Sequence, residues 1–85
     1  MTYSLEWSTV AADNLAKLDK KIADRVSKKV EKIRRDPLTY LKRLTGVPLY
    51  SLRIGDYRAI ISISIEKEYI LVLKVGRRKN VYDKL

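Results

Sequence analysis

The sequence contains no cysteine and no histidine. Without cysteine the chain has no disulfide, no thiolate metal ligand and no thiol nucleophile. Without histidine it has no histidine-based catalytic triad, no histidine-ligated zinc and no pair of histidines for acid–base cleavage of RNA. Any chemistry therefore falls to carboxylates, hydroxyls, tyrosines and the abundant cations.

Acidic residues are also scarce, with 10 Asp and Glu against 19 Lys and Arg, which gives a net charge of +9. Such an excess indicates a polyanion, a membrane surface or an acidic protein as the partner, and it says little about the fold. Asp56 and Asp83 are too few to form a metal cluster, since two-metal nucleases need several convergent carboxylates. We expect neither a metal nor another cofactor.

Long apolar runs and a signal-peptide pattern are absent as well, so we expect a cytoplasmic protein without membrane contact. A chain of 85 residues has room for one domain, which we take as residues 1–85. Hydrophobic residues make up 46% of the sequence, which is enough for a packed core and argues against disorder.

The first half of the chain changes from strand-like to helix-like periodicity. Tyr3, Leu5 and Trp7 alternate with polar residues, which predicts a half-buried strand, and Ser8 is placed to cap a following helix. Apolar residues then recur every three or four positions, as in an amphipathic helix. They are Ala11, Leu15, Leu18, Ile22, Val26, Val30 and Ile33. We expect a break at Asp19, which makes a helical hairpin, and an end at Asp36 because Pro37 follows.

The second half predicts a loop over 38–47 and then three antiparallel strands over 48–54, 57–65 and 69–75. Gly55 and Asp56 form a tight two-residue turn between the first two of these strands. The separation of helices from strands predicts an α+β fold: an N-terminal strand, a two-helix hairpin and a three-stranded meander, with the helices on one sheet face.

The hairpin turn fixes which residues share a face, because directly opposed residues point to the same side. Ile54 then faces Tyr57, and Arg53 faces Arg58. The predicted core face carries large apolar residues and an alanine, namely Tyr50, Leu52, Ile54, Tyr57, Ala59, Ile61, Ile63 and Ile65. The other face carries Ser51, Arg53, Arg58, Ser62 and Ser64, with Ile60 as its apolar exception.

A three-residue loop after Ile65 would keep the apolar residues of the last strand on the core face. That register predicts Tyr69, Leu71, Leu73 and Val75 in the core. It places Lys74 and Gly76 on the arginine face, with Gly76 opposite Arg58, and Arg78 joins them if the strand continues. Because opposed like charges destabilise a sheet, converging arginines favour a phosphate site; a solvated basic face or arginines paired with carboxylates are the alternatives.

Five segments together resemble the RelE/ParE superfamily of toxins from type II toxin–antitoxin systems, and its order of elements agrees with the predicted one. They are LTGVP (44–48), YSLR (50–53), GDYR (55–58), VGRR (75–78) and VY (81–82). The resemblance to the RelE-like branch implies an mRNA endoribonuclease that works in the ribosomal A site, without a metal, through the substrate's own 2′-hydroxyl.

By position in the resemblance, Arg58 would bind the phosphate and Arg78 would protonate or stabilise the leaving group. Tyr82 would stack on or orient the substrate, and Arg53 takes the place of a lysine that activates the nucleophile. An arginine is a poor general base, so we expect it to stabilise developing charge instead. Further substrate contacts are expected from Arg43, Ser51, Lys74, Arg77 and Lys79, where Ser51 replaces a second lysine of the family.

The resemblance also implies an acidic, RelB-like antitoxin as a partner, besides the ribosome and mRNA. Two other functions stay open at this point. A ParE-like toxin would inhibit gyrase without nuclease activity, although that function needs neither Arg78 nor Tyr82. A basic RNA-binding domain without activity would bind RNA in a strongly salt-dependent manner.

Overall fold

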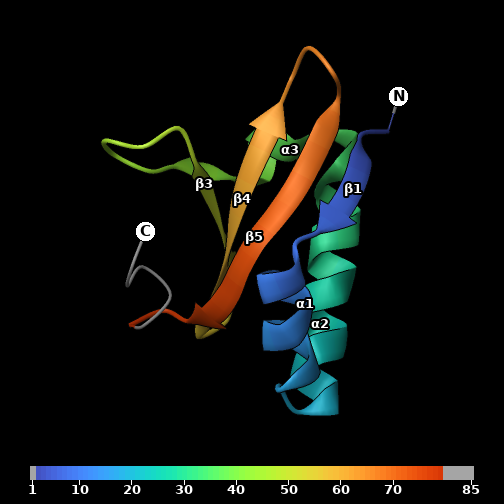
Figure 1. The fold of residues 1–85 in the computed structure, drawn as a ribbon, viewed down its shortest axis with the longest axis vertical. Coiled ribbons are helices and arrows are strands. Elements are labelled where there is room, and N and C mark those ends of the chain that lie inside the picture. The colour runs from blue at the N-terminus through green and yellow to red at the C-terminus, as the bar shows by residue number, and fades with distance from the viewer. Residues whose placement is uncertain (1, 80–85) are drawn as a thin grey trace.

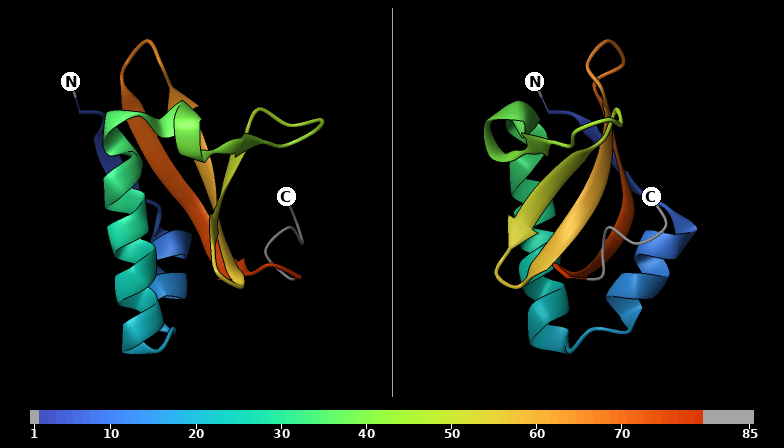
Figure 2. Two further views of the ribbon diagram at one scale, coloured as in Figure 1. Left: turned by 180° about the vertical axis from the view of Figure 1, so that it is seen from behind. Right: turned by 90° about the vertical axis from the view of Figure 1, so that its left-hand side faces the viewer.

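The computed structural model describes residues 2–79 as a sheet backed by helices. The elements are β1 (Ser4–Trp7), α1 (Thr9–Ala16), α2 (Lys20–Lys32), the 3-10 turn η1 (Ile33–Arg35), α3 (Pro37–Tyr40), β2 (Lys42–Arg43), β3 (Tyr50–Ile54), β4 (Tyr57–Ser64) and β5 (Tyr69–Arg77). The sheet has five strands in the order β1-β5-β4-β3-β2, and β1 runs parallel to β5. Helices α1 and α2 lie on the same face of the sheet (Figure 1, Figure 2). The predicted α+β fold is confirmed.

The predicted helical hairpin is present. The Ser8 hydroxyl caps α1 by accepting a hydrogen bond from the Ala11 N–H at 3.0 Å, and α2 begins directly after Asp19. The whole predicted apolar stripe contributes to the core, with Ala11, Val26 and Val30 fully buried. Within the described residues, no helix is long and apolar enough to cross a membrane.

The loop predicted over 38–47 is partly wrong, because that stretch contains most of α3 and all of β2. Proline is favoured in the first turn of a helix, where its missing N–H has no partner to lose, and Pro37 starts α3 in this way. The two exposed residues of β2 pair with β3 at the sheet edge and show no apolar alternation that a sequence pattern could detect.

The β3–β4 hairpin has the predicted register. Ile54 pairs with Tyr57 and Arg53 pairs with Arg58 across a turn whose first residue, Gly55, has a φ of 59°. This left-handed conformation favours glycine. The predicted pairing of Arg58 with Gly76 is also present between β4 and β5.

The rest of the β4–β5 register differs from the prediction because β5 contains a bulge. Ile60 pairs with Lys74 but Ile61 pairs with Val72, so Leu73 is an extra residue with no partner. Beyond this point the faces of β5 are exchanged relative to the prediction. Ile70 and Val72 enter the core in place of Tyr69, Leu71 and Leu73, and Ile65 lies 57% exposed in a longer turn.

The N-cap residue of α1, Ser8, and a residue within α1, Asn14, form hydrogen bonds with backbone groups of β5 around the bulge. Ser8 donates its hydroxyl to the Leu73 carbonyl at 2.9 Å, and its N–H bonds the Val72 carbonyl at 2.9 Å. The Asn14 side-chain oxygen accepts from the Val75 N–H at 3.0 Å. These contacts fix the end of β5 that carries Lys74 and Gly76.

A candidate phosphate-binding site on the open sheet face

Two arginines lie side by side on the sheet face that α1 and α2 leave uncovered. Arg53 on β3 is exposed and pairs with the half-buried Arg58 on β4, and Gly76 on β5 is the next residue in the same row. Opposed like charges on paired strands cost a folded protein about 0.2–1 kcal/mol. Gly76 adds no side chain of its own to this row, so Arg53 and Arg58 are its only charged members among the described residues.

Neither arginine is neutralised by a carboxylate in the described part of the chain. The ion pair found there joins Arg34 on η1 to Glu31 on α2. Among the described residues, Arg53 donates a single long hydrogen bond of 3.4 Å to the Gly55 carbonyl, and the buried Nε of Arg58 has no hydrogen-bond partner. Within residues 2–79 the alternative of arginines paired with carboxylates is therefore not observed, and among these residues both guanidinium groups retain donors for an anion.

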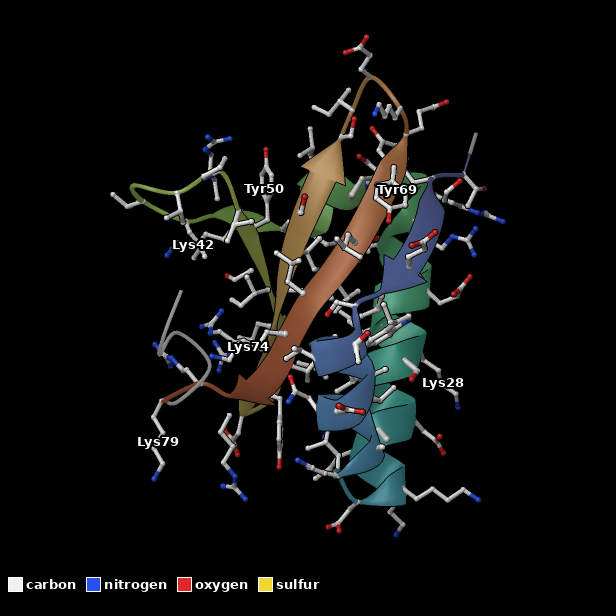
Figure 3. The ribbon with its side chains drawn as sticks, in the orientation of Figure 1. Lys28, Lys42, Tyr50, Tyr69, Lys74 and Lys79 are labelled. Carbon is white, nitrogen blue, oxygen red and sulfur yellow. The ribbon has the colours of Figure 1, made fainter. Side chains whose placement is uncertain are left out.

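A second row runs parallel to the arginines. It consists of Lys42, Ser51, Ile60 and Lys74, from β2, β3, β4 and β5 respectively (Figure 3 labels the two lysines). Ser51 is only 2% exposed and its hydroxyl has no partner, whereas Lys42 is exposed. Lys42 was absent from the predicted set, because the strand that brings it to this face is too short to be recognised in the sequence.

The end of β5 returns to the hairpin turn. The Arg78 N–H bonds the Asp56 carbonyl at 2.9 Å, which holds the exposed Arg78 and Lys79 close to the turn that precedes Arg58. These residues, with Asp56 and Arg77, line an open cavity of about 570 Å³. Tyr82, predicted to contact the substrate, lies outside the described residues.

Two of the predicted cations are not brought to this face. Arg43 pairs with Tyr50 and Arg77 pairs with Tyr57, and both tyrosines share the face of the helix-covered core. Each guanidinium carbon lies 5.7 Å from the centre of its tyrosine ring, a cation–π geometry that gives both arginines a structural partner. This placement does not favour the predicted substrate contact of Arg43. Arg77 also lines the cavity beside Arg78, so its predicted contact stays a hypothesis.

The arrangement as a whole, a helix-backed five-stranded sheet with a cationic open face, is that of a class of proteins: the small toxins of type II toxin–antitoxin systems with the RelE/ParE fold. The sequence profile of the ParE toxin of the type II toxin–antitoxin system parDE matches residues 5–82, and the chain therefore belongs to this family.

Solved structures agree with this assignment. The toxin–antitoxin complex RelBE2 from Mycobacterium tuberculosis matches with 28% identity and a TM-score of 0.85, over 92% of this chain and 100% of that one. The archaeal RelE–RelB complex from Pyrococcus horikoshii matches with 26% identity and a TM-score of 0.81, over 95% and 100%. A chromosomal ParDE system from P. aeruginosa shares the fold at 18% identity and a TM-score of 0.73, over 89% and 96%. The comparison with curated proteins finds no match.

Proposed function

We propose that this toxin is an mRNA endoribonuclease that acts on ribosomes in the cytoplasm without a metal ion. The observation that carries the proposal is the pair of opposed arginines, Arg53 and Arg58, with no carboxylate partner in the described residues. The RelE-like resemblance and the similarity to solved RelE chains support the same reading.

In the proposed reaction the 2′-oxygen of a nucleotide attacks the adjacent phosphorus. The bond from phosphorus to the 5′-oxygen breaks, which leaves a 2′,3′-cyclic phosphate and a 5′-hydroxyl. The proton lost by the 2′-hydroxyl and the proton gained by the 5′-oxygen are exchanged with solvent or with groups of the ribosome. Arg53 and Arg58 stabilise the additional charge on the five-coordinate phosphate, and Arg78 stabilises the leaving oxygen. Tyr82 orients the base.

The proposed partner that silences the toxin is an acidic antitoxin. The similar chains from M. tuberculosis and P. horikoshii come from complexes with antitoxins, and a net charge of +9 attracts an acidic segment as well as RNA. Antitoxin binding over the arginine face would exclude the substrate directly.

Cleavage of mRNA on programmed ribosomes tests the function. Arg58→Ala and Arg78→Ala should each lower the cleavage rate by about a hundredfold or more, as removal of one charge-stabilising donor does in other enzymes. Arg35→Ala is the matched control, because Arg35 is exposed, lies on η1 and does not line the cavity at Arg78. Unchanged cleavage by the Arg58→Ala, Arg78→Ala double variant would refute this site.

A second function, inhibition of gyrase, is favoured by one observation: the family profile that matches is that of ParE toxins. A supercoiling assay separates the two functions. Inhibition of gyrase by the purified chain, together with intact mRNA on ribosomes, would replace the nuclease by the gyrase inhibitor.

A further inference from the structure

A basic groove lies between α2 and the end of β3. It has a volume of about 360 Å³ and is lined by Arg25, Lys28, Lys29, Lys32, Arg53, Ile54 and Gly55. In the described residues none of these cations forms an ion pair with a carboxylate. The groove thus collects positive charge that the fold does not neutralise.

The cations of α2 form a regular stripe on one helix face. Arg25, Lys28, Lys29 and Lys32 follow the spacing i, i+3, i+4 and i+7, which brings their side chains together along the groove. Like charges four residues apart on a helix are mutually destabilising, so pairing within α2 does not account for this stripe. Lys29 and Lys32 also lie 5.7 and 5.6 Å from the centre of the Tyr40 ring, a cation–π contact that leaves their positive charge in place, and Arg25 and Lys28 lack such a contact among the described residues. Arg25 closes one end: its guanidinium lies 3.2 Å from where a Cβ on Gly55 would be.

Arg53 belongs both to the groove and to the open sheet face. It lines the groove beside the α2 cations and pairs with Arg58 across the hairpin. A polyanion bound at Arg58 can therefore continue over Arg53 into the groove without leaving cationic surface.

We propose that this groove binds the phosphates of the substrate RNA strand that flank the cleaved bond. The inference rests on the proposed ribonuclease function and extends the substrate path from the sheet to α2. Single-stranded nucleic acids are commonly held by such cationic grooves, which follow the backbone without reading the sequence.

The lining favours RNA over an acidic protein segment. Protein partners bind through apolar or aromatic anchors, and the apolar residue of this groove, Ile54, is only 7% exposed. The exposed apolar side chains Val10, Leu38 and Ile65 belong to α1, α3 and the β4–β5 turn instead. The exposed ring of Tyr40 does lie beside the groove, 5.7 Å from Lys29 Nζ and 5.6 Å from Lys32 Nζ, where an aromatic ring can also stack on a base of a single strand.

The test uses the full chain and 2′-O-methyl oligouridylates, which lack the attacking hydroxyl and so report binding alone. Two lengths are compared, about 4 and about 12 nucleotides, which span the usual site sizes of single-strand binders. The variant Lys28→Gln, Lys32→Gln removes two groove charges. The control Lys20→Gln, Lys21→Gln removes the same charge from α2 at residues that do not line the groove.

The groove variant should bind the longer oligonucleotide roughly tenfold more weakly, with a slope of log K against log salt that is smaller by about 1.4, as expected for two lost contacts to single-stranded phosphates. It should bind the shorter oligonucleotide like the natural chain, and the control should lose clearly less affinity. Equal losses in both variants, equal losses at both lengths, or no binding of the longer oligonucleotide by the natural chain would overturn the proposal. Oligoglutamate serves as a probe for an acidic protein segment. If it binds the natural chain as tightly as RNA does, and the groove variant loses this binding, the occupant is an acidic protein segment and the proposal is overturned.

Ribosomal cleavage measured in parallel keeps the two proposals apart. Suppose that the natural chain cleaves mRNA and that the groove variant binds both oligonucleotide lengths normally. This result would refute RNA binding by the groove and would leave the proposed ribonuclease function intact. A natural chain that cuts no mRNA but shows the length-dependent loss refutes the nuclease while supporting the groove as an RNA-binding surface.

Discussion

At the scale of single residues, two serine hydroxyls differ in whether they form hydrogen bonds within the described residues. The Ser8 hydroxyl accepts from Ala11 and donates to Leu73, whereas the buried Ser51 hydroxyl has no partner. Ser8→Ala should therefore lower the free energy of unfolding by about 1–2 kcal/mol. Ser51→Ala should leave it unchanged or raise it by up to about 1 kcal/mol, because it removes a buried unsatisfied group. Urea denaturation of both variants measures the difference, and a Ser51→Ala loss as large as that of Ser8→Ala would contradict it.

The Tyr69 side chain predicts a pH dependence. Its hydroxyl donates to a Glu6 carboxylate oxygen at 3.0 Å, and this hydrogen bond, with smaller effects of burial and of the Glu6 charge, raises the pKa of Tyr69 above 10.0. A raised folded-state pKa gives stability that is present below the unfolded-state pKa and is lost as pH rises through the folded-state value.

The natural chain should therefore lose stability more steeply with pH than a Tyr69→Phe variant, in the range from about pH 10 upward. Urea midpoints measured at several pH values around this point compare the two chains. Parallel curves would show that the hydrogen bond to Glu6 does not hold the proton in solution.

At the scale of elements, one side chain joins α1 to the bulged part of β5. Asn14 accepts a hydrogen bond from the Val75 N–H, and Val75 is 4% exposed. Asn14→Ala should lower the free energy of unfolding by about 1–3 kcal/mol, because a buried N–H loses its partner. Asn14→Asp is the matched control, since it keeps an oxygen acceptor in the same place and should cost clearly less. Equal losses in the two variants, by urea denaturation, would refute this role.

These contacts also explain which parts of the sheet the sequence could predict. The β3–β4 register depends on a two-residue turn, a signal held within a few neighbouring residues, and it was predicted correctly, as was Gly76 opposite Arg58. The bulge at Leu73 is supported by Ser8 and Asn14, which lie more than sixty residues away in sequence, at separations of 65 and 61. The alternation of apolar and polar residues in β5 predicts an unbroken register. That prediction is wrong because the contacts that support the bulge come from residues distant in sequence.

The candidate site likewise contains residues whose placement the sequence predicts and residues whose placement it does not. Arg53 and Arg58 share a face because of the local turn, so their convergence was predictable. Lys42 reaches that face only through the edge pairing of β2, and Arg43 is turned to the other face by the same pairing. Neither outcome has a signal in the sequence, since a two-residue strand has no recognisable periodicity.

At the scale of the whole molecule, charge repulsion dominates the electrostatics. The net charge is +9, and the described residues contain a single ion pair, Arg34–Glu31. The cationic open face and the groove beside α2 add local repulsion to this net charge. Self-repulsion of this kind destabilises a compact state and is relieved by salt.

Raising the ionic strength from about 0.01 M to about 0.15 M shortens the screening length from about 30 Å to about 8 Å, so the free energy of unfolding should rise by on the order of 1 kcal/mol. The Lys20→Gln, Lys21→Gln variant, with less charge to screen, should respond less. Urea denaturation in sodium chloride measures both, and a chain that salt destabilises would contradict the argument.

Sulfate at matched ionic strength separates screening from anion binding. Screening depends on ionic strength, whereas an anion held by Arg53 and Arg58 adds stability that grows with its own concentration. Sulfate also strengthens apolar burial in general, an effect shared by every variant of this chain. The excess stabilisation by sulfate over chloride should therefore shrink in an Arg53→Gln, Arg58→Gln variant and persist in Arg35→Gln. An identical sulfate excess in both variants would mean that the arginine row holds no tetrahedral anion.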